Sequence, residues 1–193
     1  STEIDINNIV TPLVVLKDYL KFKNYKIYTY GSNQLSSYVN NISEITSSPN
    51  DCDFILIGRK EKDNNLEVDN IINSIKNGKK AMALNKDLTY PTSDNKEIPG
   101  NGAIVKYIEE KSKKSIQSFG KPDELYTEYL LSQKYKISYV IGDRVDTDIL
   151  LGSKIKAKTF LVSSSIDNYM EDKIADYKFN NFSESVSFIL QNF

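Results

Sequence analysis

Residues Ile137–Gly152 read I-S-Y-V-I-G-D-R-V-D-T-D-I-L-L-G, and this stretch decides how the rest of the chain is interpreted. A short apolar run, Tyr139–Ile141, ends at Gly142. Three acidic residues follow, namely Asp143, Asp146 and Asp148. An amphipathic run then begins at Ile149. This order predicts a buried strand, a tight turn that carries carboxylates, and a helix that packs back on the sheet.

The three acids allow two interpretations. The carboxyl ends of the strands line the ligand crevice in open α/β sheets, so Asp143 is expected where chemistry takes place. Acids this close repel one another unless a cation lies among them, and a hard divalent ion such as Mg²⁺ is the usual cation. Alternatively, Asp146 or Thr147 only caps the helix while the other acids are solvated. The spacing alone favours neither interpretation.

The composition bounds the class of protein. The chain has 193 residues, of which 39% are hydrophobic and 26% are charged, which predicts an ordinary soluble protein with one large domain or two small ones. Its formal net charge is −1, which argues against a nucleic-acid partner because such proteins normally carry a basic face. No apolar run approaches the roughly 18–20 residues that span a bilayer, and residues 1–20 lack the signature of a signal peptide. We therefore expect a cytoplasmic protein with no membrane partner.

Histidine and cysteine usage narrows the chemistry further. The chain has no histidine, which removes Ser-His-Asp and Cys-His catalysis and most catalytic zinc sites. Its single cysteine, Cys52, excludes an internal disulfide and fits a reducing compartment. Cys52 precedes Gly58-Arg59 as in a cysteine-phosphatase loop, but Phe54–Ile57 has the pattern of a strand. Cys52 is therefore interpreted as an ordinary residue at the start of a strand.

Predicted strands alternate with predicted helices along the chain, which indicates βαβ units, a largely parallel sheet and an α/β fold. The predicted strands are Lys26–Tyr30, Phe54–Ile57, Ala81–Leu84, Ile116–Phe119, Tyr139–Ile141, Thr159–Val162 and Tyr177–Phe179. Helices are predicted from Pro12, over Gln34–Val39, Leu66–Ile75, Ala103–Lys113 and Asp123–Gln133, after Ile149, and around Val186–Leu190. Two polar segments, Asn40–Asn50 and Asn85–Gly102, are predicted to be loops, and the second is long enough to be functional.

A second strand end carries a candidate for the same chemistry. The predicted strand Ile116–Phe119 is followed directly by Gly120-Lys121-Pro122. A lysine beside metal-bound carboxylates suits phosphoryl transfer, because the metal neutralises phosphate oxygens and the ammonium stabilises charge in the transition state. By position alone Lys121 is most simply a solvated surface lysine. Together with the acidic turn, the functional interpretation is favoured.

These segments resemble a known family. Residues Gly142–Gly152 are similar to the fourth motif of haloacid dehalogenase-type (HAD) phosphatases, in particular the branch of 4-nitrophenylphosphatase, phosphoglycolate phosphatase and pyridoxal phosphatase. Gly120-Lys121-Pro122 resembles the third motif of that branch, which carries its phosphate-contacting lysine. Two further segments, Asn85–Asp94 and Pro99–Ala103, resemble its cap-domain run. The motifs occur in the order and spacing of the family, and the resemblance covers essentially the whole chain.

The resemblance implies a domain organisation. A partial Rossmann-like HAD core, which is a parallel sheet with flanking helices, would be combined with a large α/β cap domain inserted between the second and third motifs. Residues 1–10 would be a linker from the missing N-terminal core. Residues 11–113 would be the cap, and residues 114–193 the C-terminal half of the core.

The resemblance also implies roles for single residues. Asp143 would be a direct Mg²⁺ ligand, and Asp148 a catalytic carboxylate that supports the metal and its waters. Lys121 would be the catalytic lysine that binds the phosphate of the substrate. Asn85 and Asn101 would face the substrate from the cap. Asp146 inherits no catalytic role and is interpreted as a turn or cap residue.

The chain departs from the family at its start. The first motif, an Asp-x-Asp after an N-terminal strand, supplies the nucleophile and the general acid/base, and the second is a phosphate-binding Ser or Thr; both precede the cap. Asp5-Ile6-Asn7 is no substitute, because it lacks the preceding apolar strand and the second aspartate. The residue that would become the aspartyl-phosphate is therefore expected outside these residues. Smaller departures, Asp123-Glu124 in place of Ser-Pro and Ser163–Ser165 in place of Thr-Gly, bear on substrate preference.

The resemblance therefore implies a Mg²⁺-dependent phosphatase that hydrolyses small-molecule phosphate monoesters through an aspartyl-phosphate intermediate, with this chain inactive alone. The alternative is a non-catalytic HAD-like binding or interaction module that has lost the first motif. A phosphoacceptor receiver domain fits poorly, because receivers place the acidic residues before the lysine and here Lys121 comes first. The expected partner is a small-molecule phosphate ester, and a homodimer is an analogy with the family.

Overall fold

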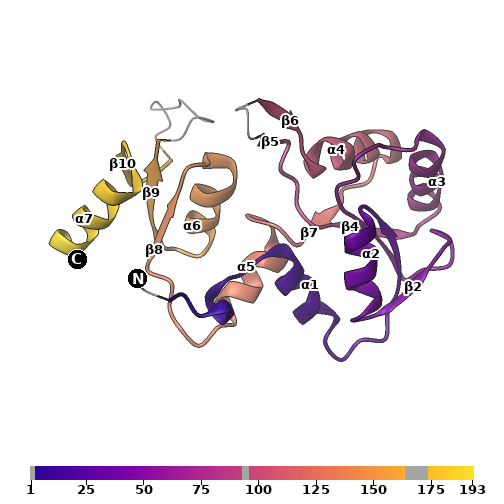
Figure 1. Cartoon of the computed structure of the whole chain (residues 1–193), viewed down its shortest axis with the longest axis horizontal. Coiled ribbons are helices and arrows are strands. Elements are labelled where there is room, and N and C mark those ends of the chain that lie inside the picture. Colours follow the sequence, from indigo (N-terminus) through magenta and orange to yellow (C-terminus); the bar gives the residue numbers. More distant parts are fainter. Residues whose placement is uncertain (1–2, 93–95, 164–173) are drawn as a thin grey trace. The chain divides into compact units, whose positions relative to one another are not determined.

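A computed structural model describes residues 3–92, 96–163 and 174–193 of the chain. The chain divides into two compact units, Ser1–Gly120 and Lys121–Phe193, whose elements are labelled in Figure 1. The division proposed from the sequence lies earlier, between residues 113 and 114, and these domain limits stay a prediction. Parts of two segments compared with the family, at positions 93–94 and 164–165, lie outside the described residues.

A five-stranded parallel sheet with the order β2-β1-β3-β4-β7 forms the centre of the first unit. Its strands are β1 (Lys26–Tyr30), β2 (Glu44–Thr46), β3 (Phe54–Ile57), β4 (Lys80–Ala83) and β7 (Gln117–Ser118). The central strand β3 is buried along its whole length, as its continuous apolar sequence requires in a parallel sheet. Tyr28 pairs with Ile55 and Ile55 pairs with Ala81, so these three side chains share one face of the sheet.

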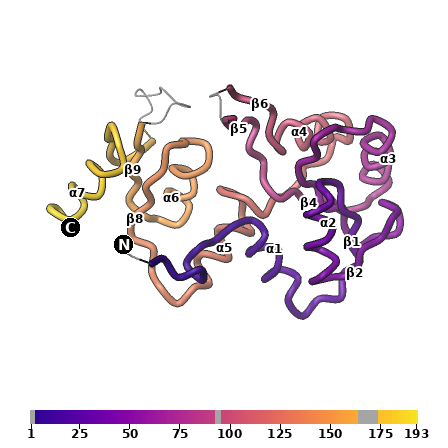
Figure 2. Tube along the Cα trace, in the orientation of Figure 1, coloured from indigo at the N-terminus to yellow at the C-terminus, as the bar shows by residue number. Residues whose placement is uncertain are grey.

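Four helices accompany the strands of the first unit, and the trace in Figure 2 follows their order along the chain. They are α1 (Pro12–Leu20), α2 (Asn33–Asn40), α3 (Asn65–Lys76) and α4 (Asn101–Ser112). Polar side chains cap the first three, because Thr11, Ser32 and Asn64 accept hydrogen bonds from backbone amides of the first turn. One buried apolar cluster joins α3 and α4 to the face of the sheet that carries Ile55.

An aromatic cluster covers the opposite face of this sheet. Tyr19 on α1 contacts the rings of Phe54 and Phe119, with ring centroids 6.4 and 5.4 Å apart. Tyr25 adds a stacked contact with Tyr19 at 6.1 Å. Because Phe54 and Ile55 are adjacent on β3, they point to opposite faces, and the first unit is therefore a sheet between two helical layers.

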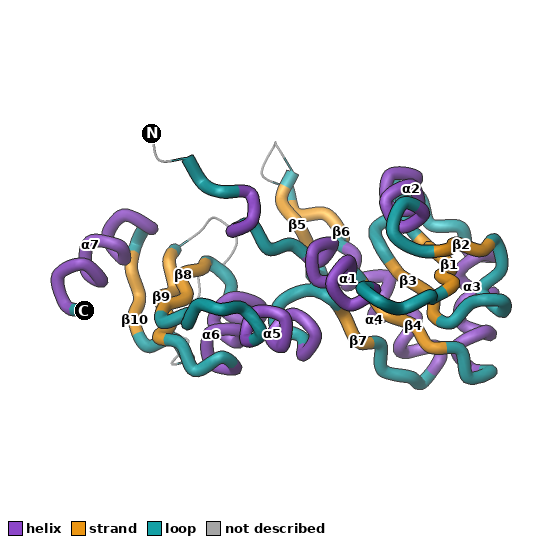
Figure 3. The backbone as a smooth tube through the Cα atoms, turned by 90° about the horizontal axis from the view of Figure 1, so that it is seen from below, coloured by secondary structure: helices purple, strands orange, loops and turns teal. Residues whose placement is uncertain are grey.

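The second unit contains a three-stranded parallel sheet with the order β10-β9-β8. Its strands are β8 (Tyr139–Gly142), β9 (Lys158–Val162) and β10 (Tyr177–Phe179), and its helices are α5 (Glu124–Leu131), a π-helix (Val145–Ile149), α6 (Leu150–Lys154) and α7 (Phe182–Asn192). Figure 3 shows α6 beside β8 and β9, and α7 beside β10. A second aromatic cluster, centred on Phe160, joins the sheet to α7 through Tyr177, Phe179 and Phe188.

Strand β8 differs from the central strand of the first unit. Among the described strands it pairs only with β9, and Tyr139 at its start is 37% exposed. The other residues of β8 are half-buried, although the sequence predicted a buried strand here. The apolar run forms the predicted strand, but one edge and part of a face of that strand remain accessible in the second unit.

Two segments predicted to be loops contain short strands. Strand β2 lies within Asn40–Asn50, and β5 (Thr89–Pro91) pairs with β6 (Glu97–Pro99) in antiparallel fashion within Asn85–Gly102. The loop predictions are wrong at these strands, because three-residue strands have no readable period and form through pairing with their neighbours. Among the residues that the structure describes, no helix has the length and apolar character needed to cross a membrane.

Candidate functional site

The acidic turn consists of a strand end, an extended residue and a π-helix. Strand β8 ends at Gly142, and Arg144 is extended, with φ −119° and ψ 126°. The carbonyl of Arg144 accepts hydrogen bonds from the amides of Asp148 at 3.0 Å and Ile149 at 3.2 Å, and the second bond closes the wider π-helical turn. Single π-helical turns are rare and occur frequently at functional sites. The strand, turn and following helix match the sequence expectation, whereas the widening of the turn does not show in the sequence.

Lys121 and the acidic turn meet at Asp148. The ammonium Nζ of Lys121 lies 2.6 Å from Oδ1 of Asp148. The Asp148 side chain is 12% exposed and that of Lys121 is 42% exposed. A carboxylate this buried needs partners for its charge, and the ammonium of Lys121 and the amide of Arg144, 3.4 Å from Oδ2, supply them. The Lys121 side chain is thus paired with a buried carboxylate while part of its own surface stays exposed.

Gly142 leaves the space that the Asp148 side chain occupies. A Cβ at position 142 would lie 2.2 Å from Cβ, 2.4 Å from Cγ and 2.5 Å from Oδ2 of Asp148. Real atoms do not approach this closely, so the residue before Asp143 must be glycine for Asp148 to keep its position. The carboxylate of Asp148 is therefore packed against the backbone that leads directly into Asp143.

The three acids of the turn have different surroundings. Asp148 pairs with Lys121. Asp146 accepts two hydrogen bonds from one edge of the Arg144 guanidinium, with Nε 3.1 Å from Oδ1 and Nη2 2.9 Å from Oδ2. Asp143 is half-buried and forms no side-chain hydrogen bond or ion pair with any residue that the structure describes. Within this turn, the carboxylate of Asp143 is the one whose oxygens are not already engaged by protein groups.

The donor set of the turn fits a magnesium ion held mainly by water and phosphate. In the described parts of the chain, no group of three or more His, Cys, Asp or Glu side chains is placed to hold a metal. Mg²⁺ does not need such a group, because it usually binds one or two carboxylates and keeps several waters or phosphate oxygens. Asp143, with the carboxylate of Asp148 packed against the preceding backbone, matches that pattern.

Two residues that the sequence did not single out interact with Lys121 or with the residue that follows it. The Nζ of Lys154 on α6 donates to the carbonyl of Pro122 at 2.6 Å. Tyr126 on α5 is 7% exposed. Burial raises the pKa of the Tyr126 hydroxyl, the charge of Lys121 lowers this pKa, and the charge of Asp148 raises it. Both residues occupy helical positions that look in sequence like an ordinary core tyrosine and an ordinary helix-end lysine.

The two asparagines predicted to face the substrate lie in the first unit. Asn101 is 5% exposed, and its Nδ2 donates to the carbonyls of Ile57 at 3.2 Å and Asn85 at 2.8 Å. The Oδ1 atoms of Asn85 and Asn101 are both buried, and neither has a hydrogen-bond partner among the described residues. Asn101 therefore joins the end of β3 to the loop that begins at Asn85. Contact of either side chain with a substrate stays a prediction.

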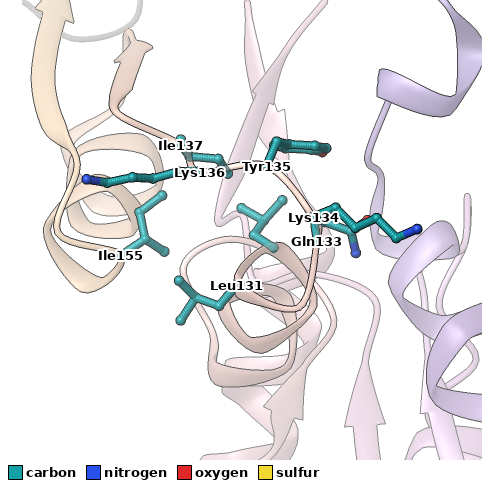
Figure 4. Close-up of a pocket in the computed structure, with 8 residues that line it drawn as sticks. Leu131, Gln133, Lys134, Tyr135, Lys136, Ile137 and Ile155 are labelled. Carbon is teal, nitrogen blue, oxygen red and sulfur yellow. The ribbon is translucent and has the colours of Figure 1, made fainter.

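A pocket of about 330 Å³ opens in the second unit at the opposite end of β8 from Asp143. Leu131, Ile137 and Ile155 supply its apolar lining, and lysine side chains extend from its edge in Figure 4. Neither Lys121 nor an acid of the turn lines it. The pocket is therefore separate from the candidate phosphate site.

The candidate site lies in the part of the chain that matches a known family model. A family model described as HAD-hydrolase-like matches residues 118–185, which contain Lys121 and the whole acidic turn. The matched segment is HAD-like. Acid sugar phosphatase from Staphylococcus epidermidis is 24% identical over 169 residues, which are 84% of this chain and 64% of that protein. The chain thus spans less than two thirds of the length of the first curated relatives it matches.

Solved structures show that the similarity of fold extends beyond this segment. The p-nitrophenyl phosphatase from Archaeoglobus fulgidus superposes with a TM-score of 0.81 at 23% identity, covering 97% of this chain and 77% of that one. A glycerol phosphate phosphatase from Mycobacterium tuberculosis, solved in complex with calcium, gives a TM-score of 0.66 at 23% identity and covers 79% of this chain and 47% of that one. These similarities confirm the predicted α/β fold with a parallel sheet and flanking helices.

Proposed function

We propose that this chain is part of a Mg²⁺-dependent phosphatase that hydrolyses small-molecule phosphate monoesters through an aspartyl-phosphate intermediate. The observation that carries the proposal is the Lys121–Asp148 ion pair at 2.6 Å, which lies in the HAD-like segment beside the strand that leads into Asp143. Relatives that are named as phosphatases support the reaction class. The 193 residues have no Asp-x-Asp at the end of an N-terminal apolar strand, so the nucleophile is proposed to lie outside them.

Lys121 is proposed to bind the phosphate. A lysine ammonium is a compact point charge of the kind that proteins use for phosphate. Asp148 accepts a hydrogen bond from this ammonium, and the Lys121 side chain is 42% exposed. The positive charge of the ammonium would stabilise the negative charge of the transferring phosphoryl group. Lys154 holds the backbone beside Lys121, because its Nζ donates to the carbonyl of Pro122.

The acidic turn is proposed to hold the metal. Asp143 would bind Mg²⁺ directly, and Asp148 would orient Lys121 and accept hydrogen bonds from waters near the metal. When bound, the ion would supply charge neutralisation at the phosphate oxygens.

We further propose that Asn85 and Asn101 shape the substrate side of the first unit, that the protein is cytoplasmic, and that it forms a homodimer.

The proposal is tested with two forms of the protein, the 193-residue chain and a longer form that includes the residues encoded before Ser1. The substrate is p-nitrophenyl phosphate with Mg²⁺. We expect turnover by the longer form and none by the chain alone. In the longer form, Asp143→Asn and Lys121→Met should each lower kcat/KM by about 100-fold or more, because each removes a charge that stabilises the transition state.

Three results would refute or redirect the proposal. Turnover by the chain alone that survives Asp143→Asn would refute the assignment of the site. A start codon directly before Ser1, together with no turnover under any condition, would favour the non-catalytic module. If the longer form carries an apolar strand that ends in Asp-x-Asp but its activity is unchanged by Lys121→Met, the phosphate binds elsewhere.

A further inference from the structure

The three carboxylates of the acidic turn do not have the same partners. Three carboxylates lie within six residues, and the structure engages two of them in different ways. Asp148 is directed to Lys121, while Asp146 is directed to Arg144. The distribution of partners, and not only the number of charges, therefore decides which carboxylate can meet a metal ion.

Arg144 is well placed to decide which carboxylates have protein partners. Its side chain is 19% exposed, and its guanidinium grips Asp146 through two parallel hydrogen bonds of 3.1 and 2.9 Å. A planar guanidinium matches a carboxylate in this two-bond geometry, whereas a lysine ammonium does not. Arg144 also supplies the backbone groups that bond to Asp148.

Stability alone gives little reason for this pair. The Asp146 side chain is 56% exposed, and ion pairs with a partner in solvent contribute on the order of 0–1 kcal/mol. Without Arg144, the charge of Asp146 would still be solvated, because this side chain is exposed. Its carboxylate would, however, be a third oxygen donor in the turn, in competition with Asp143 for any divalent cation. Arg144 removes that competitor by binding it.

We propose that Arg144 is a positioning residue that sorts the acids of the turn, holding Asp146 so that Asp143 is the carboxylate left for the metal. The inference rests on the proposed function, because it takes Asp143 as the metal ligand. It assigns Asp146 the reciprocal role: this carboxylate keeps the guanidinium away from Asp143. The two side chains act as a neutral pair beside the metal site, and each is harmful to that site without the other.

This reciprocity gives single substitutions of opposite sign. Asp146→Asn releases Arg144 from this carboxylate, and the guanidinium is then drawn to Asp143, so we expect the affinity for Mn²⁺ to fall about three- to tenfold. Arg144→Gln leaves Asp146 as an additional donor and makes the turn more negative, so the affinity should rise about threefold. The double variant, Arg144→Gln with Asp146→Asn, should return to within about twofold of the unsubstituted chain.

The measurement uses the 193-residue chain and the Mn²⁺ ion alone, because carboxylate sites for Mg²⁺ also accept Mn²⁺. The electron paramagnetic resonance signal of the free ion reports binding without any turnover, and Mg²⁺ competition shows that the same site is occupied. Lys136→Gln is the charge-matched control. It removes one positive charge at the opposite end of β8, where Lys136 lies on the pocket, and should leave the affinity unchanged. Circular dichroism verifies that every variant is folded.

The possible outcomes separate the inference from the proposed function. If Asp143→Asn leaves Mn²⁺ binding intact, or if the unsubstituted chain binds no Mn²⁺, Asp143 is not the metal ligand. Both the metal assignment and this inference are then wrong. If Asp143→Asn abolishes binding but both single substitutions at 144 and 146 weaken it and the double variant is no better, the pair is only a structural clamp. Unchanged affinity in both single variants would also overturn the inference while leaving the proposed function standing.

Discussion

Gly142 is the residue whose replacement should disturb the candidate site most directly. A methyl group there would meet three atoms of the Asp148 side chain at 2.5 Å or less. We expect Gly142→Ala to lower the free energy of unfolding of the second unit by about 2 kcal/mol, because the side chain or the strand must shift to remove the overlap. Urea unfolding followed by circular dichroism measures this.

Gly78 provides the contrasting control in the first unit. It has φ +97°, yet nothing lies within 4 Å of the place where its Cβ would be. Gly78→Ala should therefore cost only about 1 kcal/mol, through the strained backbone and not through overlap. Equal losses for the two variants would contradict the view that Gly142 is fixed by the packing of Asp148.

Asp176 should make the second unit sensitive to acid. Its carboxylate accepts hydrogen bonds from the amide of Thr159 at 2.8 Å and from its hydroxyl at 2.7 Å, and these bonds lower the pKa of Asp176. A carboxyl whose pKa is lower in the folded state stabilises the fold above its unfolded pKa of about 4. That stabilisation disappears as the pH falls through the lower folded value.

Asp176→Asn is the corresponding test. At neutral pH the substitution should lower the free energy of unfolding by about 1 kcal/mol, a modest loss because Asp176 is exposed. The difference from the unsubstituted chain should shrink as the pH is lowered below about 4, since the native carboxyl is then protonated as well. Urea midpoints measured over this range decide the matter, and a constant difference would exclude the proposed cause.

At the level of elements, Asn101 at the start of α4 should hold two connections of the first unit together. Its amide donates to carbonyls at the end of β3 and at Asn85. Asn101→Ala should cost about 1–3 kcal/mol, because both buried carbonyls lose a donor. Asn101→Asp should cost more, since its carboxylate cannot donate and would be buried as a charge. Thermal unfolding of the variants tests the order, which a solvent-facing Asn101 would not produce.

The elements also show which parts of the fold can be predicted from the sequence. β1, β3 and β10 have the predicted bounds, because each is an apolar or alternating run between polar residues. The same logic fails for β2, β5 and β6, whose three residues gain their order from neighbouring strands.

In the site, the close association of Lys121 with Asp148 agrees with expectation. The choice of Asp146 by Arg144 could not be predicted, because it depends on the width of a π-helical turn that packing determines.

For the whole molecule, the two units should differ in how readily their strands open. β3 and β4 lie inside a five-stranded sheet, and β3 is fully buried. β8 pairs with one described neighbour and is half-buried. We therefore expect the backbone amides of β3 to exchange with solvent at least about tenfold more slowly than those of β8. Hydrogen exchange followed by mass spectrometry on peptides from both strands measures this, and equal protection would contradict it.

The separate aromatic clusters of the two units have a spectroscopic consequence. The chain contains 13 tyrosines and no tryptophan, so its intrinsic fluorescence comes from tyrosine alone. Tyr25 belongs to the cluster of the first unit and Phe188 to that of the second, and both are half-buried. A single tryptophan introduced as Tyr25→Trp or Phe188→Trp would be the only indole in these 193 residues. The colour of its emission would then report the loosening of one unit at a time, on the same chain and without any added label.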